Sequence, residues 1–382
     1  MKKERNMWLD GIMGLAVGDA LGVPVEFSLR DWLTEIPVQD MRGYGTHPVP
    51  KGTWSDDTSM TWAALDSLRE GYAPNLMADK FCEWAFANKY TPWGEIFDIG
   101  GTTSRALRKY YYSKNPLTCG EAAEGSNGNG ALMRILPVCL YCYSLEKNEK
   151  LAAEDSIDII FEATAITHAH LRSKLASALY YFVCCAVLEA NNMKTAVADG
   201  LKKGFEFFDK TPEYAEELKN YDRLRDIENF ADLPHEQIQS TGYVVHSLEA
   251  ALWCLLNTNN YADSVLEAVN LGGDTDTIAA IAGGLAGLFY GYDAIPKEWL
   301  GVLARCKELE AACTDPTKAE EHSYEYISIM PKRRLRNYTK IKLFLETLLE
   351  KETDINTKTL INYMLQKNER SYKEYLEMLE DE

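Results

Sequence analysis

Two short acidic strings, far apart in the chain, contain side chains that could bind metal ions. They are Ser55-Asp56-Asp57-Thr58 and Asp274-Thr275-Asp276-Thr277. Together they supply four carboxylates and several hydroxyls, which are the hard oxygen donors that Mg²⁺ and similar cations prefer. Four carboxylates brought together without cations would repel one another and raise each other's pKa values. Two divalent cations would cancel this charge, so the strings predict a paired-metal site.

Each string stands at the expected start of a helix and has glycine nearby. Adjacent Asp56 and Asp57 cannot share one helical face, and Asp274 and Asp276 are only two positions apart. Both pairs can therefore converge on a cation only where the backbone turns, as it does at a helix entry. Either string alone could instead be an N-cap with a second acid that stabilises the helix dipole. The recurrence of Asp and Thr at two helix starts favours the metal site.

Two further acids follow irregular segments. A glycine-containing helix is expected to end near Gly22, because Pro24 prevents its continuation, and this places Glu26 in the loop that follows. A carboxylate there is either a surface residue or an acid/base group held in a cleft, and taken alone the surface position is favoured. Asp98 lies in a loop before Thr102, where it could join the acidic site or cap the following helix.

A glycine-rich loop, Gly125 to Ala131, precedes an apolar segment. A loop that opens a helix presents backbone N–H groups that can hold phosphate oxygens, although the glycine spacing matches neither the Walker nor the dinucleotide pattern. An ordinary loop is the alternative. The phosphate interpretation is favoured because an acidic protein needs a local positive pole to hold an anionic ligand. If His168 and His170 lie on a helix, their side chains point in different directions. We therefore expect one of them to contact a ligand and the other to pack against the protein.

Helical periodicity dominates the chain, and few segments alternate as strands do, so the expected fold is all-α. Small residues at helical spacing, first from Gly11 to Gly22 and again from Ala280 to Gly291, predict closely packed helices. The main domain is expected at 1–331, with a charged helical insertion at 202–239, and a helical C-terminal extension at 332–382 that begins with the basic stretch Lys332–Arg336. The periodic segments are Thr61–Arg69, Leu76–Ala87, Ala131–Leu145, Ile157–Thr167, Arg172–Ala190, Val244–Leu256 and Ile278–Tyr290.

Composition argues against some classes of partner. A net charge of −18 disfavours a protein with a broad basic face for nucleic acid or anionic membrane. Neither a signal-peptide pattern nor a long apolar run is evident, so we expect no membrane span and a cytoplasmic location. The nine cysteines are expected to be reduced, and Cys139 and Cys142 are expected to pack in the core rather than form a redox pair.

Taken together, these segments resemble the ADP-ribosylglycohydrolase family, which includes ADP-ribosyl-acceptor hydrolases and dinitrogenase reductase-activating glycohydrolases. The resemblance extends from about Trp8 to Trp299 and keeps the order of five separate motifs. These are Gly18-Asp19-Ala20-Leu21-Gly22 with Glu26, Ser55-Asp56-Asp57-Thr58, Gly128-Asn129-Gly130-Ala131 with Met133-Arg134, Thr167-His168, and Gly272-Gly273-Asp274-Thr275-Asp276-Thr277.

The resemblance implies an all-α domain with two Mg²⁺ or Mn²⁺ ions at its centre. Where the family often has threonine, this chain has Ser55, which keeps the hydroxyl donor. Catalytic roles are implied for Glu26, Asp57 and, less directly, Asp98. The implied metal ligands are Ser55, Asp56, Asp57, Asp274, Asp276 and Thr277, and the implied ADP-ribose pocket is lined by Ser126, Asn127, Gly128, Asn129, Gly130, Ala131 and His168.

The implied reaction is hydrolysis of the glycosidic bond at C1 of the ribose distal to adenosine, which releases ADP-ribose from a protein or small-molecule conjugate. Its transition state has oxocarbenium character, so nearby carboxylates and cations assist. The motifs do not distinguish arginine, serine, acetyl-ester and nucleic-acid acceptors. Two alternatives stay open: a metal-dependent phosphohydrolase acting on a nucleotide pyrophosphate, and a catalytically silent ADP-ribose-binding or immunity-type protein.

Overall fold

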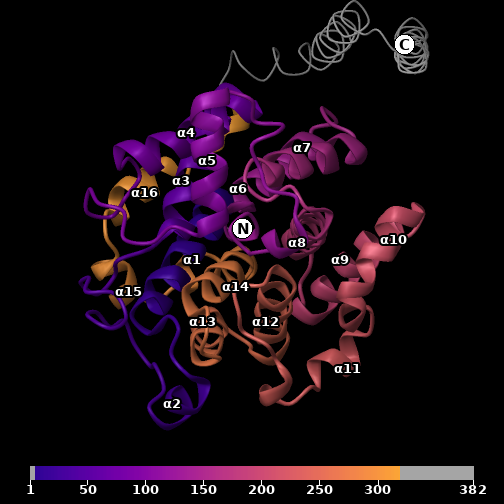
Figure 1. Cartoon of the computed structure of the whole chain (residues 1–382). Helices are drawn as coiled ribbons and strands as arrows, with labels where there is room; N and C mark the ends of the chain where they lie inside the picture. The colour runs from indigo at the N-terminus through magenta and orange to yellow at the C-terminus, as the bar shows by residue number, and fades with distance from the viewer. Residues whose placement is uncertain (1–4, 319–382) are drawn as a thin grey trace, which may run out of the picture. The chain divides into compact units, whose positions relative to one another are not determined.

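A computed structural model describes residues 5–318 (Figure 1). Within this part of the chain there are sixteen α-helices and no β-strand, only two isolated β-bridges, which confirms the all-α prediction. The predicted extension at 332–382, its basic start Lys332–Arg336, and residues 319–331 lie outside the described residues. The helices are α1 (Met7–Gly22), α2 (Arg30–Glu35), α3 (Asp56–Ser67), α4 (Pro74–Ala87), α5 (Gly101–Ser113), α6 (Leu136–Lys147), α7 (Ala153–Ala165), α8 (Leu171–Glu189), α9 (Met193–Phe208), α10 (Pro212–Leu218), α11 (Ile227–Ala231), α12 (Val244–Asn257), α13 (Tyr261–Asn270), α14 (Thr275–Tyr290), α15 (Lys297–Val302) and α16 (Cys306–Ala312).

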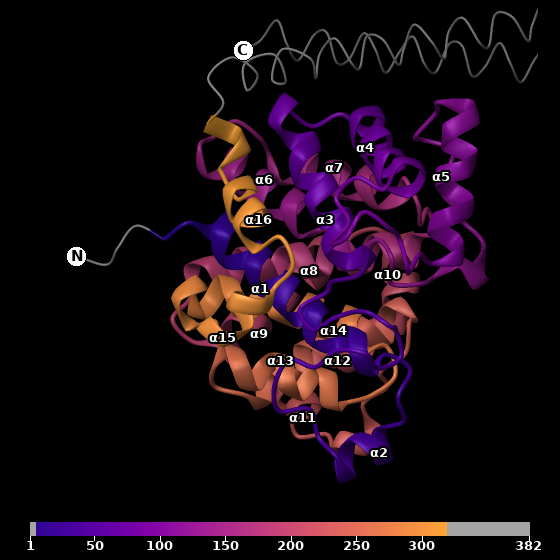
Figure 2. The same ribbon diagram turned by 90° about the vertical axis from the view of Figure 1, so that its left-hand side faces the viewer.

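The centre of the fold is the pair α1 and α14, which lie side by side in both views (Figures 1 and 2). Their glycines make this contact possible: a Cβ added at Gly18 would lie 2.1 Å from the carbonyl oxygen of Ala279. A Cβ at Gly14 would lie 2.4 Å from the carbonyl oxygen of Gly283. Because these distances are far below van der Waals contact, any larger residue would force the two helices apart. The predicted close packing of the two small-residue segments is confirmed.

Other helices surround this pair. Helices α3 to α7 lie on one side of α1 and α14, and α11 to α13 lie on the other (Figures 1 and 2). The first residues of α3 and of α14 both point toward the end of α1, where the chain turns through a short 3₁₀ helix, η1 (Val23–Val25). The two predicted acidic strings therefore begin helices at one common place.

The structure bears on two predictions about element boundaries. The continuous helix expected over Ala131–Leu145 is wrong, because a 3₁₀ turn, η4 (Leu132–Arg134), precedes α6. Pro137 lies in the first turn of α6, where its missing N–H costs nothing, and it disfavours helical backbone just before it. The predicted start of an insertion at Lys202 falls in the middle of α9, and the chain that follows buries Leu218, Tyr221 and Leu224 against the core.

Two further predictions concern the cysteines, expected to be reduced, and membrane-spanning helices, expected to be absent. All nine cysteines are free, and Cys139 and Cys142 are fully buried, as predicted. Two helical stretches, Met7–Val25 and Leu171–Glu189, are long and apolar enough to span a membrane by length and composition alone. In their most apolar windows 94% and 67% of the residues are buried inside the fold, and core helices pass the same test, so the finding is weak evidence for a span.

Candidate active site

Asp19, in the last turns of α1, fixes the start of α3. The backbone N–H of Ser55 donates to the Asp19 carboxylate at 2.9 Å, and Thr58 donates to it from its N–H at 3.0 Å and its hydroxyl at 2.6 Å. Burial raises the pKa of Asp19 to about 6, and these hydrogen bonds lower it in part. Asp19 had no predicted role, although its place in a glycine-bounded motif was a usable signal.

The start of α14 approaches the end of α1 equally closely. A Cβ on Gly22 would lie 2.3 Å from the Cα of Asp276, and the hydroxyl of Thr275 donates to the Gly22 carbonyl at 2.8 Å. Gly273 has φ +72°, a left-handed conformation that favours glycine, and a Cβ there would lie 2.1 Å from the Ser240 carbonyl oxygen. Asp274 occupies the N-cap position of α14, but its side chain caps no backbone N–H.

The two acidic strings meet, as predicted. The hydroxyl of Thr277 donates to Asp57 Oδ2 at 3.2 Å across 220 positions of sequence, and the Ser55 hydroxyl donates to the same oxygen at 3.1 Å. Glu26, Asp274 and Asp276 each have a carboxylate oxygen within 4.8 Å of the other two. The N-cap alternative accounts for Ser55, whose hydroxyl accepts from the Asp57 N–H, but it leaves the carboxylates unexplained.

The charged groups at the place where the two acidic strings meet are arranged as expected for a cation-binding site. Burial raises the pKa values of Asp56, Asp57 and Asp276 well above the usual range, and neighbouring carboxylates raise them further. Asp57 Oδ1 is buried and has no hydrogen-bond partner within residues 5–318. A buried carboxylate oxygen without a partner is costly unless a cation or proton compensates it. The donor set, all carboxylates and hydroxyls, suits a hard divalent cation such as Mg²⁺ or Mn²⁺.

Glu26 and Asp98 lie beside these acids. Glu26 is 4% exposed, so the surface position favoured from its local sequence is wrong. Burial, and next the charges of Asp98 and Asp274, raise the pKa of Glu26 to about 9. Asp98 does not cap α5, whose N-cap residue is Gly100, and it approaches Glu26 and His47 to within 4.8 Å. Of the two alternatives for Asp98, the structure therefore shows that it joins the acidic cluster.

His47 is a member of this cluster that the sequence did not predict. Its Nε2 lies 2.5 Å from Glu26 Oε2, and its ring packs against Phe97 with centroids 5.0 Å apart. It comes from an irregular loop between α2 and α3, where no periodic pattern indicates which side chains turn inward.

A cavity of about 250 Å³ opens onto the acids. Acidic and hydroxyl groups line it together with part of the glycine-rich loop and His168, so residues of both the predicted acidic site and the predicted ADP-ribose pocket meet at one cavity. Its lining includes Glu26, Asp56, Asp98, Asp274, Thr277, Thr103, Gly128, Asn129, Gly130, Met133, His168 and Gly242.

The glycine-rich loop only partly follows expectation. Gly128, Asn129 and Gly130 line the cavity, whereas Ser126, Asn127 and Ala131 do not. The prediction that the loop opens an α-helix is wrong, because η4 intervenes before α6. The N–H of Asn129 donates to the Gly242 carbonyl at 3.0 Å, and its side chain donates to Asp274 Oδ2 at 2.7 Å. The loop is thus tied to the acidic string.

The remaining loop side chains hold the loop in place. The Ser126 hydroxyl donates a hydrogen bond to Glu121 Oε2 at 3.0 Å, and the Ser173 hydroxyl donates one to Asn127 Oδ1 at 3.0 Å. Ala131 is buried. Ser126 and Asn127 therefore tie the loop to Glu121 and Ser173.

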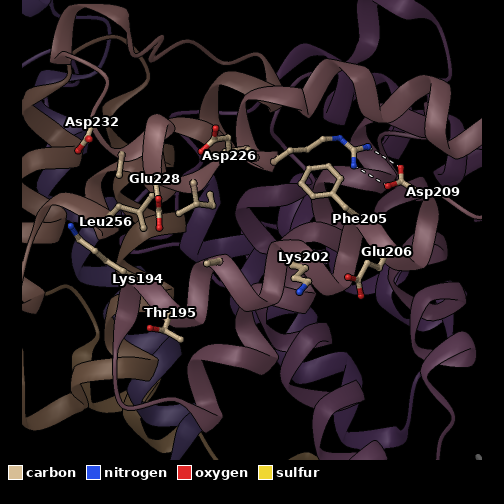
Figure 3. Close-up of a pocket in the computed structure, with 15 residues that line it drawn as sticks. Lys194, Thr195, Lys202, Phe205, Glu206, Asp209, Asp226, Glu228, Asp232 and Leu256 are labelled. Atoms are coloured by element: carbon tan, nitrogen blue, oxygen red, sulfur yellow. Dashed lines mark hydrogen bonds and ion pairs between the residues drawn. The ribbon is translucent and has the colours of Figure 1, made fainter.

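A larger cavity of about 980 Å³ lies apart from these residues, between α9 and the segment around α11 (Figure 3). Its charged side chains are partly paired with one another: Arg225 binds Asp209 at 2.8 and 2.9 Å and its guanidinium lies 4.2 Å above the Phe205 ring. None of the predicted site residues lines it. The smaller cavity is therefore the candidate active site.

Comparison with known proteins agrees with this geometry. A sequence model described as ADP-ribosylglycohydrolase matches residues 3–325. The chain is 31% identical to an ADP-ribosylarginine hydrolase of Serratia proteamaculans, over 77% of this chain and 74% of the relative. It is also 31% identical to the ADP-ribosyl-[dinitrogen reductase] glycohydrolase of Rhodospirillum rubrum. That alignment covers 77% of this chain and 89% of the relative. A solved structure, an ADP-ribosylglycohydrolase-related protein complex, superposes with a TM-score of 0.63 at 30% identity and covers 82% of this chain and 97% of its own.

Proposed function

Because this chain belongs to the ADP-ribosylglycohydrolase family, and is a hydrolase that separates ADP-ribose from its acceptor, we propose that the acceptor is an arginine side chain of a protein. The Serratia relative is named an ADP-ribosylarginine hydrolase. A relative from Pseudomonas putida, 30% identical to this chain, has the same name. The observation that carries the proposal is the set of acidic side chains on the cavity wall, which includes Glu26, Asp56 and Asp98. Carboxylates attract a guanidinium, which is always charged and donates only.

Two divalent cations, Mg²⁺ or Mn²⁺, complete the site in this proposal. Their ligands come from both strings: Ser55, Asp56, Asp57, Asp274, Asp276 and Thr277. When bound, the cations would supply positive charge that attracts ribose oxygens and water and that relieves the repulsion among the carboxylates. The orphaned Asp57 Oδ1 and the raised pKa values of these aspartates support the assignment.

The chain's own groups would then move protons. In the reaction the oxygen of water forms a bond to C1 and loses a proton, while the bond from C1 to the guanidine nitrogen breaks and that nitrogen gains a proton. Glu26 and Asp98, which face the cavity, are the carboxyls placed to carry these protons. His47 holds Glu26 Oε2 and leaves the other carboxylate oxygen for this exchange.

The glycine-rich loop and His168, which also line the cavity, would bind ADP-ribose itself. Gly128 and Gly130 carry no side chain, which lets a diphosphate or ribose approach their backbone closely. A Cβ on Gly130 would come within 3.0 Å of the His168 ring and 3.1 Å of the Thr103 hydroxyl, so any larger residue would fill this part of the cavity. The cytoplasm is our proposed location, since free cysteines persist in a reducing compartment.

Identification of the released nucleotide tests the proposal. We expect the protein, incubated with arginine-linked ADP-ribosyl protein and Mg²⁺, to release ADP-ribose, and EDTA to stop the release. A serine-linked substrate is the matched control. Release only from serine would refute the acceptor assignment. AMP with ribose phosphate would instead indicate a phosphohydrolase, and binding without turnover would indicate a silent binder.

A further inference from the structure

His168 is buried between the cavity and a hydrogen-bonded pair formed by Arg134 and Thr167. His168 is 2% exposed. On the cavity side, its Nε2 lies 3.5 Å from the position that a Cβ on Gly128 would take. On the opposite side, its Nδ1 lies 2.9 Å from Thr167 Oγ1. The two ring nitrogens face different surroundings, so the position of the ring hydrogen decides whether the cavity meets a donor or an acceptor.

Arg134 determines the direction of these hydrogen bonds. It is fully buried, and its Nη2 donates to Thr167 Oγ1 at 2.9 Å and to the Ala163 carbonyl at 3.2 Å. A guanidinium has donors only, so Thr167 Oγ1 must accept from it. The one hydrogen of the Thr167 hydroxyl is then available for another acceptor.

That acceptor is His168 Nδ1. In the described part of the chain, the Thr167 hydroxyl is hydrogen-bonded to Arg134 and His168 alone. If Nδ1 carried a hydrogen, it would also donate to Thr167, and the buried hydroxyl hydrogen would be left without an acceptor, which destabilises the fold. The arrangement in which the Thr167 hydroxyl both accepts and donates a hydrogen bond is Arg134 to Thr167 to His168.

We infer that Arg134 and Thr167 hold His168 in the tautomer that carries its hydrogen on Nε2, so that the cavity meets an N–H donor. Burial, and next the charge of Arg134, lower the pKa of His168 to about 3, so the ring stays neutral near pH 7 and has one N–H. Arg134 and Thr167 are positioning residues, and His168 is the residue that faces the ligand.

This donor indicates the chemistry of the ligand atom. Four acidic side chains line the cavity, from Glu26, Asp56, Asp98 and Asp274, and in the described part of the chain no lysine or arginine lines it. An N–H donor on His168 binds a phosphate or hydroxyl oxygen without adding charge. The assignment of that oxygen to ADP-ribose rests on the proposed function, whereas the tautomer does not.

Nitrogen NMR on the ¹⁵N-histidine-labelled full-length chain, without ligand, tests the tautomer. The His168→Gln variant identifies the ring signals. We expect Nδ1 to resonate as an unprotonated nitrogen and Nε2 as a protonated one. Thr167→Val keeps the side-chain shape and removes the hydroxyl. In that variant we expect a partly protonated Nδ1 and an affinity for ADP-ribose about 5- to 10-fold lower by calorimetry. Thr167→Ser should restore both.

Thr164→Val is the matched control, because the Thr164 hydroxyl is also buried but bonds to the Ile160 carbonyl at 2.8 Å, away from His168. It should leave the ring signals unchanged. A protonated Nδ1 in the unmodified protein would overturn the inference, and so would a folded Thr167→Val variant with unchanged ring signals. If the expected tautomer is found but ADP-ribose does not bind, the proposed function fails and the tautomer stands.

Discussion

Glu26 Oε2 and His47 Nε2 lie 2.5 Å apart, although the residues are separated by 21 positions and belong to different irregular segments. The Thr46 hydroxyl adds a second link by donating to the Glu26 backbone carbonyl at 2.6 Å. The loop between α2 and α3 therefore holds both the main chain and the carboxylate of Glu26. Since Glu26 is also crowded by other acids, this contact decides where its carboxylate points.

We expect His47→Leu to lower kcat about 10-fold with a smaller change in KM, because Glu26 loses the partner that orients it. His47→Gln keeps a polar side chain that can donate, and it should retain more activity. Steady-state hydrolysis of ADP-ribosylarginine protein measures both variants. Equal rates for His47→Leu and the unmodified protein would show that this contact does not serve catalysis.

Asp57→Asn should abolish tight Mn²⁺ binding and lower activity about 100-fold or more, because it removes a carboxylate at the meeting point of both strings. Asp66→Asn, on the same helix, is the control. Asp66 pairs with Lys80 at 3.0 Å away from the cavity. Calorimetric titration with Mn²⁺ gives the affinities. The metal assignment would be wrong if Asp57→Asn bound Mn²⁺ as the unmodified protein does.

Gly18→Ala should destabilise the fold by about 2 kcal/mol or more, because its Cβ would lie 2.1 Å from a backbone oxygen of α14, which cannot move without shifting the helix. Gly301→Ala is the matched substitution, since no atom lies within 4 Å of a Cβ there and the residue is exposed in α15. It should leave stability unchanged or raise it by roughly 0.5 kcal/mol. Chemical denaturation measures both, and equal losses would contradict the packing argument.

The fold could be predicted where the sequence repeats a pattern over several turns. Helices α8, α12 and α14 lie within a few residues of their predicted bounds, because each keeps a mainly apolar sequence over several turns and is largely buried. Short helices such as α15 and α16, of six and seven residues, had no such signal. Fewer than two turns contain too few positions to show a period.

The residues of the candidate site also differ in how far the sequence could predict them. Asp57 and Thr277 were predicted together because matching residue types recur at helix starts, and the structure joins them. Asp98 had two alternatives from sequence, because the path of an irregular loop decides whether it reaches a cavity or a helix end. His47 had no signal at all, since its role depends on a contact between two loops rather than on any spacing.

Glu249 gives a prediction about stability and pH that is independent of the metal site. It is buried on α12 next to Arg223, 2.8 Å away, and burial raises its pKa to about 7 while Arg223 lowers it in part. Because the folded-state pKa exceeds the unfolded value, folding favours the protonated form. The stability that this residue contributes is fully present below pH 4.5 and is lost as the pH rises through 7.

Glu249→Gln removes this titration. The free energy of unfolding of the unmodified protein should therefore fall by roughly 2–3 kcal/mol more than that of the variant between pH 4.5 and pH 8. Urea denaturation of both proteins at several pH values gives the difference, in which the titration of all other acids cancels. A difference that does not change with pH would mean that Arg223 keeps Glu249 ionised in the folded protein, so that the ion pair outweighs the cost of burial.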